Sequence, residues 1–496
     1  MLLTEVAAMA DASMHGGDAT RSSHRGKAIG LAVAAAVGGF LFGFDSSVIN
    51  GAVDAVQGQF DLSGVVTGFV VAIALLGSAL GAWLGGRLSD RWGRTRVMVL
   101  GAVLFFVSSV LSAFAFAAWD LALWRAMAGV GIGIASVIAP AYIAEIAPAA
   151  MRGRLGSLQQ LAITLGIFAA LLSDQILATS ADGAANELWF GLEAWRWMFL
   201  VCVVPAAVYG ILALRIPESP RFLVAQAHPD KARAVLADVL PPDESPEERV
   251  AQIEQTIRSD AALAQQSSLR GPTLGLLPVV WVGILLSVFQ QFVGINVIFY
   301  YSTTLWQAVG FEESQSFTIS TITSVTNVVV TFIAIALIDK IGRRPLLLIG
   351  SAGMTLALGV MAIAFLNSTG SGDSLSLEGP WGVIALVAAN LFVVFFGATW
   401  GPLVWVLLGE MFPNRIRAAA LGVAAAAQWI ANFLITVSFP ELLERFGASI
   451  PYFMYSAFAL ISFFFVLAKV PETKGVQLED MEGLKVDRRP RRQQTA

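Results

Sequence analysis

Twelve long apolar segments limit what this 496-residue sequence can fold into more than any other feature does. A helix needs about 20 consecutive apolar residues to cross the hydrocarbon core of a bilayer. Only 13% of the residues are charged, against roughly 25% in an ordinary soluble domain. We therefore predict an all-α membrane protein whose twelve transmembrane helices lie at 28–50, 64–86, 97–117, 121–143, 155–175, 195–214, 276–304, 316–338, 345–366, 382–409, 418–438 and 450–469.

Composition and a few residue types exclude several classes of function. The net charge of −4 provides no basic field for nucleic acid. The single cysteine, Cys202, excludes an internal disulfide and a thiolate cluster, and reads as a small buried apolar residue. All three histidines lie in polar segments, so we expect no metal, no cofactor and no enzyme activity in the bilayer. Gly129, Gly131 and Gly133 lie within a span and indicate a close-packing helix face rather than a nucleotide loop.

The basic residues predict the orientation. Of 31 Lys and Arg residues, 28 lie in the tails or after even-numbered spans, whereas only Arg196 and Arg445 lie on the other side and Arg125 lies within a span. The positive-inside rule then places both termini in the cytoplasm of a protein of the cell membrane. The residues before 28 carry basic charge, and the long apolar run that follows lacks a small-residue cleavage site, so we expect a cytoplasmic tail rather than a signal peptide.

The two halves of the chain repeat each other. The segment from Asp90 to Arg94 returns as the segment from Asp339 to Arg343, and Glu145 and Arg152 return as Glu410 and Arg417. Glu218, in Pro-Glu-Ser-Pro-Arg, is echoed by Glu472, in Pro-Glu-Thr-Lys-Gly. Parallel six-helix repeats are typical of transporters that rock around a site at the midplane.

One long polar segment separates these halves. Charged residues between 217 and 272 have helix-compatible spacing, and we expect a small cytoplasmic helical subdomain there, with a disordered linker as the alternative. The predicted organisation is a cytoplasmic tail (1–27), a first bundle (28–214), a linker domain (215–275), a second bundle (276–469) and a cytoplasmic tail (470–496).

Asp45 is the first candidate for function, because it is the only ionisable residue in the first span. A carboxylate at the centre of a bilayer costs about 2.5–3.5 kcal/mol on insertion scales, and such residues are usually functional. Arg125, in the fourth span, is the only other ionisable residue that we place well inside the same half of the bundle. We expect the two to pair. Burial favours the protonated acid and the arginine favours the ionised acid, so a conformational change that separates the pair would let Asp45 bind a proton.

Uncharged amides form a second group of candidates. Gln290, Gln291 and Asn296 lie in one apolar span and share a face only if the helix unwinds near Gly294. Further amides in apolar spans are Gln160, Asn327 and Gln428. Each offers donors and an acceptor to a hydroxyl group; taken singly, each reads as a contact between helices. Pro402 predicts a bend in the tenth span.

The loop motifs, together with GGFLFGFD (38–45), QQFVGIN (290–296) and GPLVW (401–405), resemble the sugar porter family of the major facilitator superfamily. The resemblance covers roughly residues 28 to 475 and is closest to bacterial proton–sugar symporters such as the glucose and xylose permeases. It implies two six-helix bundles and a sugar site that contains the six amides. It adds Trp405, Trp429, Phe42 and Tyr300 as walls of the pocket. Family symporters have an aspartate at the position of Asp45, whereas facilitative relatives have a neutral residue.

One interpretation is that the charged loop residues only set the orientation under the positive-inside rule. The alternative is that they latch the cytoplasmic face shut, with Glu145 and Glu410 paired to arginines, when the protein is open to the outside. The predicted gating residues are Arg87, Asp90, Arg91, Arg94, Glu145, Arg152, Glu218, Asp339, Arg343, Arg344, Glu410, Arg417 and Glu472. Where the family often has Gly-Arg-Arg, this chain has Gly93-Arg94-Thr95-Arg96, which displaces one charge of the latch.

We therefore expect a monomer in the lipid bilayer that imports a neutral monosaccharide, with glucose as first candidate, together with a proton. The alternatives are an uncoupled uniporter, a symporter for xylose or galactose, and a membrane sugar sensor.

Overall fold

The computed structural model describes residues 2–148, 152–242, 244–266, 269–368, 376–377, 379–412 and 416–473. Within its helices, the side chains at 2–23, 152–154, 156–157, 260–266, 335–336, 338–339 and 417–418 are not described. Three predicted gating residues, Arg152, Asp339 and Arg417, therefore lie outside the described side chains.

The described chain is almost entirely helical, as predicted. Its helices are α1 (Leu2–Gln59), α2 (Gly64–Trp92), α3 (Arg94–Ala113), α4 (Ala118–Ile146), α5 (Arg152–Ser180), α6 (Ala194–Val201), α7 (Val203–Arg215), α8 (Pro220–Ala225), α9 (Pro229–Val239), α10 (Pro246–Gln266), α11 (Pro278–Phe292), α12 (Ile295–Tyr300), α13 (Ser302–Ala308), α14 (Glu313–Ile341), α15 (Arg343–Leu366), α16 (Trp381–Phe395), the π-helix η3 (Phe396–Trp400), α17 (Gly401–Met411), α18 (Arg417–Phe446) and α19 (Ser449–Lys469). Two short antiparallel hairpins pair β1 (Glu187–Trp189) with β2 (Leu192–Glu193) and β3 (Arg270–Gly271) with β4 (Gly275–Leu276).

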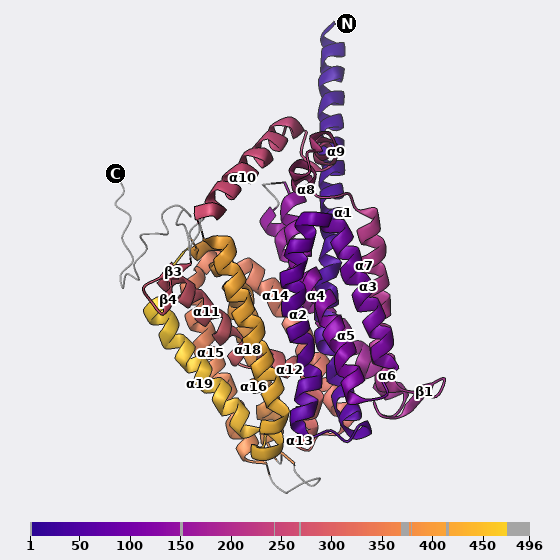
Figure 1. Ribbon diagram of the computed structural model, residues 1–496, viewed down its shortest axis with the longest axis vertical. Coiled ribbons are helices and arrows are strands. Elements are labelled where there is room, and N and C mark those ends of the chain that lie inside the picture. Colours follow the sequence, from indigo (N-terminus) through magenta and orange to yellow (C-terminus); the bar gives the residue numbers. More distant parts are fainter. Residues whose placement is uncertain are drawn as a thin grey trace.

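Twelve segments of the described chain are long and apolar enough to cross a membrane, which confirms the predicted number. They form two bundles, one from α1 to α7 and one from α11 to α19, which stand side by side in Figure 1. The helices α8 to α10 lie at one end of the bundles, here called the linker face, and β1 lies at the other end, here called the far face.

Glycines allow helices of the first bundle to pack closely. A Cβ added at Gly129 or Gly133 would lie 2.0 or 2.1 Å from a backbone oxygen of α2. A Cβ at Gly43 would lie 1.9 Å from the backbone oxygen of Ile163 on α5. Because any larger side chain would push these helices apart, the expected close-packing role of the span-four glycines is confirmed.

Three of the described spans are interrupted along their length. The sixth span changes from α6 to α7 at Cys202, which is buried as predicted. The seventh breaks at Gly294, whose φ of 82° ends α11 before α12 begins, so the predicted unwinding is confirmed. The tenth passes through the π-helix η3 directly before Pro402, where we predicted a bend.

The linker helices have a small apolar core of their own, in which Val224, Leu236 and Val250 are buried. They attach to the first span through Lys27, whose Nζ lies 2.6 Å from Oδ1 of Asp238 on α9.

Candidate functional site

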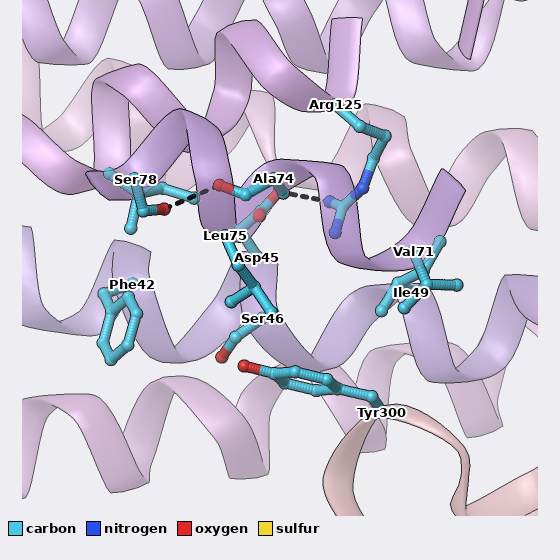
Figure 2. Close-up of a pocket in the computed structure, with 11 residues that line it drawn as sticks. Phe42, Asp45, Ser46, Ile49, Val71, Ala74, Leu75, Ser78, Arg125 and Tyr300 are labelled. Carbon is cyan, nitrogen blue, oxygen red and sulfur yellow. Dashed lines mark hydrogen bonds and ion pairs between the residues drawn. The ribbon is translucent and has the colours of Figure 1, made fainter. Parts of the chain in front are cut away.

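A buried ion pair lies at the centre of the first bundle. Nη1 of Arg125 on α4 donates to Oδ1 of Asp45 on α1 at 2.9 Å, and the two side chains are 2% and 5% exposed. Figure 2 shows the guanidinium and the carboxyl group pointing toward each other. Nε of Arg125 has no hydrogen-bond partner among the described residues. Asp45 is therefore the one acceptor in the described structure that compensates this buried cation.

The pair forms part of the wall of a small pocket. Most of the lining comes from α1, α2 and α4, and Tyr300 on α12 is the only lining residue from the second half. Figure 2 shows the Tyr300 ring beside Ser46, with Phe42 further along the same wall. The pocket thus brings together four of the predicted residues, Phe42, Asp45, Arg125 and Tyr300, at the boundary between the halves.

The three amides of the seventh span come together because the helix breaks between them. Nδ2 of Asn296 donates to Oε1 of Gln291 at 2.5 Å, and Nε2 of Gln291 lies 3.4 Å from Oε1 of Gln290. Nε2 of Gln290 also donates to the backbone oxygens of Trp400 and Gly401, at the end of η3 and the start of α17. The chain of amides therefore connects the seventh and tenth spans at their irregular segments.

The other predicted sugar ligands are more scattered. Trp429 packs edge to face on Phe42, with ring centroids 5.9 Å apart across the two halves. Oε1 of Gln428 is buried without a described partner, Asn327 is buried, and Gln160 is half-buried on α5. Trp405 is 45% exposed and does not line the pocket. Their roles as ligands stay predictions.

A contact between halves near the far face was not predicted. The amide nitrogen and Oγ1 of Thr303 donate to Asn50, and Oγ1 of Thr304 and Nε2 of Gln307 donate to Asp54 at 2.7 and 2.8 Å. The signal was present in the sequence, because Asn50 and Asp54 are four residues apart and so share one face of a helix.

The expectation that Arg125 is the only other ionisable group inside this half is wrong. Asp54 and Asp174 also lie in membrane-spanning helices. Asp54 was missed because the first span continues to Gln59, beyond the expected end at 50, whereas Asp174 lies within the expected fifth span, one residue before its end at 175.

The loop motifs form the same network in both halves. In the first half, Nε and Nη2 of Arg94 donate to Glu145 at 3.1 and 3.0 Å, and Arg94 also pairs with Asp90. Glu218 accepts from the backbone nitrogens of Arg94 and Thr95 at the start of α3. Ser219 donates to Glu145.

In the second half, Arg343 donates to Glu410 at 3.1 and 2.8 Å. Glu472 accepts from the backbone nitrogens of Arg343 and Arg344 at the start of α15, and Thr473 donates to Glu410. Pairing of both glutamates with arginines is thus present, but each pair stays within one half. A latch between the halves stays a prediction.

The remaining gating candidates contact their own surroundings. Arg87 lies over the Trp83 ring at 4.0 Å, Arg91 is exposed, and Nη2 of Arg344 donates to the backbone oxygen of Leu467. Across the described ranges, no group of three His, Cys, Asp or Glu side chains is placed to hold a metal ion.

Two six-span halves, the first of which contains a buried, ion-paired carboxyl group, are typical of a membrane transporter of the rocking type. Residues 31–484 match the family model described as "Sugar (and other) transporter". The chain belongs to this sugar transporter family.

Similar proteins cover nearly the whole chain. The glucose transport protein of Synechocystis sp. is 54% identical, over 90% of this chain and 95% of its own length. The D-xylose-proton symporter of Escherichia coli is 33% identical, over 94% of this chain and 97% of its own length. The inward-open structure of the xylose transporter XylE from E. coli matches with a TM-score of 0.78 at 33% identity, covering 92% of this chain and 99% of that one.

Proposed function

We propose that this protein imports a neutral monosaccharide, with glucose as first candidate, together with a proton. The observation that carries the proposal is the buried pair of Asp45 and Arg125. An isolated buried charge is unfavourable, so each member of such a pair depends on the other. A conformational change that separates the pair would make a proton the replacement partner of Asp45.

This dependence supplies the coupling. Contact with Arg125 favours the ionised form of Asp45 and burial favours the protonated form, so loss of the contact favours proton binding by Asp45. One proton that crosses a potential of about 100 mV releases roughly 2.3 kcal/mol, which at 1.4 kcal/mol per decade supports about fiftyfold accumulation of sugar.

The contacts between halves support an assignment of the conformation. The described hydrogen bonds between the halves lie toward the far face. They run from Asn50 and Asp54 to α13, from Gln57 and Gly64 to Glu444, and from α5 and the residues after it to α14, through Gln175 and Thr318, Leu171 and Thr321, and Ala184 and Glu313. At the linker face the ion pairs of the described loop motifs stay within one half. We read this as the state open to the linker face, and propose that this face is cytoplasmic.

The sugar is proposed from the amide chain of the seventh span and from the relatives. Gln290, Gln291 and Asn296 offer neutral donors and acceptors, which suit hydroxyl groups. The relative at 54% identity is named a glucose transport protein, and others at 37% and 33% are named for D-xylose. Because glucose and xylose differ by one hydroxymethyl group, a panel of sugars has to decide between them.

The test uses purified full-length protein in lipid vesicles. Counterflow is measured with glucose, xylose and galactose while external pH is recorded, and alkalinisation on addition of one sugar would identify both substrate and coupling. We expect Asp45→Asn to abolish uphill uptake and to leave sugar exchange largely intact.

Asp120→Asn is the matched control, because Asp120 is also buried in a span but accepts from the backbone nitrogen of Phe116 instead of an arginine. Exchange without alkalinisation in the unaltered protein would favour the uncoupled uniporter. If Asp45→Asn loses exchange as well as uphill uptake, Asp45 is structural.

A further inference from the structure

Asp174 is a buried acid that the proposed mechanism does not use. It lies on α5, its side chain is completely buried, and neither carboxyl oxygen has a hydrogen-bond partner of its own among the described residues. The carboxyl group lies against the backbone of Gly51, which belongs to the α1 helix. A Cβ at Gly51 would lie 2.8 Å from Oδ2 of Asp174, so the acid fills a space that only glycine leaves open.

No described cation compensates this acid. On the helices that pack against α5, the nearest ionisable groups are engaged elsewhere. Arg125 pairs with Asp45, Asp54 accepts from Thr304 and Gln307, Glu313 accepts from the backbone nitrogen of Ala184, Asp120 accepts from that of Phe116, and Arg196 pairs with Glu193. An ionised carboxylate without partners is strongly unfavourable away from water, and such groups neutralise instead.

Asp174 contacts α1 one to two turns away from Asp45, the acid of the ion pair with Arg125. Gly51 lies six residues beyond Asp45 on α1, which is about 9 Å along a helix axis. Oγ of Ser47 and Nδ2 of Asn50, on the intervening turn and next to Gly51, are also buried without partners.

We propose that Asp174 is a second proton-binding carboxyl group, protonated in this conformation, and that it relays protons between the far face and Asp45. The unpartnered groups of Ser47 and Asn50 are polar positions along that route. The relay role rests on the proposed function, because it requires Asp45 to be the coupling acid. Proton binding by Asp174 is independent of the proposed function.

Infrared spectroscopy of the purified full-length protein, without sugar, tests proton binding. We expect a carbonyl stretch of a protonated carboxylic acid at neutral pH that is retained in Asp45→Asn, lost in Asp174→Asn and shifted in Asp174→Glu. If Asp174→Asn does not fold, the shift in Asp174→Glu decides. A band that is the same in the unaltered protein and in the Asp174 variants would overturn the proposal. So would a band that disappears on addition of Na⁺, because it would assign a metal cation to this site.

Transport in vesicles tests the relay. We expect Asp174→Asn to slow proton-driven uptake several-fold at alkaline external pH and to leave sugar counterflow unchanged. Equal rates of driven uptake would overturn the relay role. If the unaltered protein shows no proton-driven uptake, the proposed function and the relay both fail, whereas the infrared result still decides whether Asp174 binds a proton.

Discussion

At the scale of single residues, the pair of Asp45 and Arg125 is better explained by a role in proton binding and release than by a contribution to the stability of the fold. Removing two charges from water offsets much of their attraction, so a buried ion pair contributes little net stability, although loss of one partner is strongly unfavourable. Asp45→Asn would leave Arg125 buried without a carboxylate. Transport by this variant therefore has to be normalised to the amount of folded protein in the vesicles.

The amide chain gives a prediction about sugar affinity. Gln291→Ala removes a side chain that holds Asn296 and contacts Gln290. A net hydrogen bond contributes about 0.5–1.5 kcal/mol, so we expect the half-saturating sugar concentration to rise about 2- to 10-fold for each bond to sugar that is lost. The measurement is the concentration dependence of counterflow.

Asn390→Ala is the control for this variant, because Asn390 contacts Thr326 and the backbone oxygen of Leu386 within one half. An unchanged half-saturating concentration in Gln291→Ala would mean that the amide serves helix packing alone.

At the scale of elements, the repeated loop motifs are caps that hold helix starts. Glu218 and Glu472 each accept from two backbone nitrogens at the start of α3 and of α15. A carboxylate at a helix N-terminus meets unpaired N–H groups and the positive end of the helix dipole. The preceding glycines, Gly93 and Gly342, have φ values of 95° and 105°. The repeated motifs therefore cap the same helix start in both halves, and this role is independent of any role in gating.

The short helix α13 gives a prediction about the conformational equilibrium. Thr304→Val removes one of the two hydrogen bonds that Asp54 accepts across the halves. Because this contact belongs to the state that is closed at the far face, its loss should favour the opposite state, in which the halves approach each other at the linker face.

Spin labels at Arg91→Cys and Ala419→Cys, in a Cys202→Ser background, would report this change, because both positions are exposed and lie in different halves, in the last turn of α2 and the first turn of α18. We expect the population with short label separation to increase in Thr304→Val. Thr326→Val is the control, since Thr326 bonds to Asn390 within one half. If both variants give the distance distribution of the unaltered protein, the contact between Thr304 and Asp54 does not hold the far face closed.

At the scale of the whole molecule, the asymmetry of basic charge predicts how the protein lies in the membrane. Phe190 is 93% exposed in the hairpin of the far face, and Gln226 is exposed in the linker. In the Cys202→Ser background and intact cells, we expect a membrane-impermeant maleimide to label Phe190→Cys and to label Gln226→Cys only after the cells are opened. The reverse pattern would contradict the positive-inside assignment. The domain boundaries and the monomeric state also stay predictions.

The sequence by itself determined the twelve spans, the two repeated halves, the family and the identity of the central acid. Each of these rests on local pattern or on spacing along the chain, because a span requires apolar length and Asp45 is the only ionisable residue between positions 28 and 50. The break at Gly294 was also foreseeable, since three amides could share a face only if the helix unwound.

Only the tertiary structure decided which polar groups meet and which stay without partners. Thr304 reaches Asp54 across 250 residues of sequence, and Asp174 lies against Gly51 because two helices pack closely there. Sequence spacing describes one face of one helix, whereas these contacts depend on how separate helices are rotated and placed against each other. The same reason explains why Trp405 and Trp429, both carried over from one resemblance, have different surroundings: one is exposed and the other packs on Phe42.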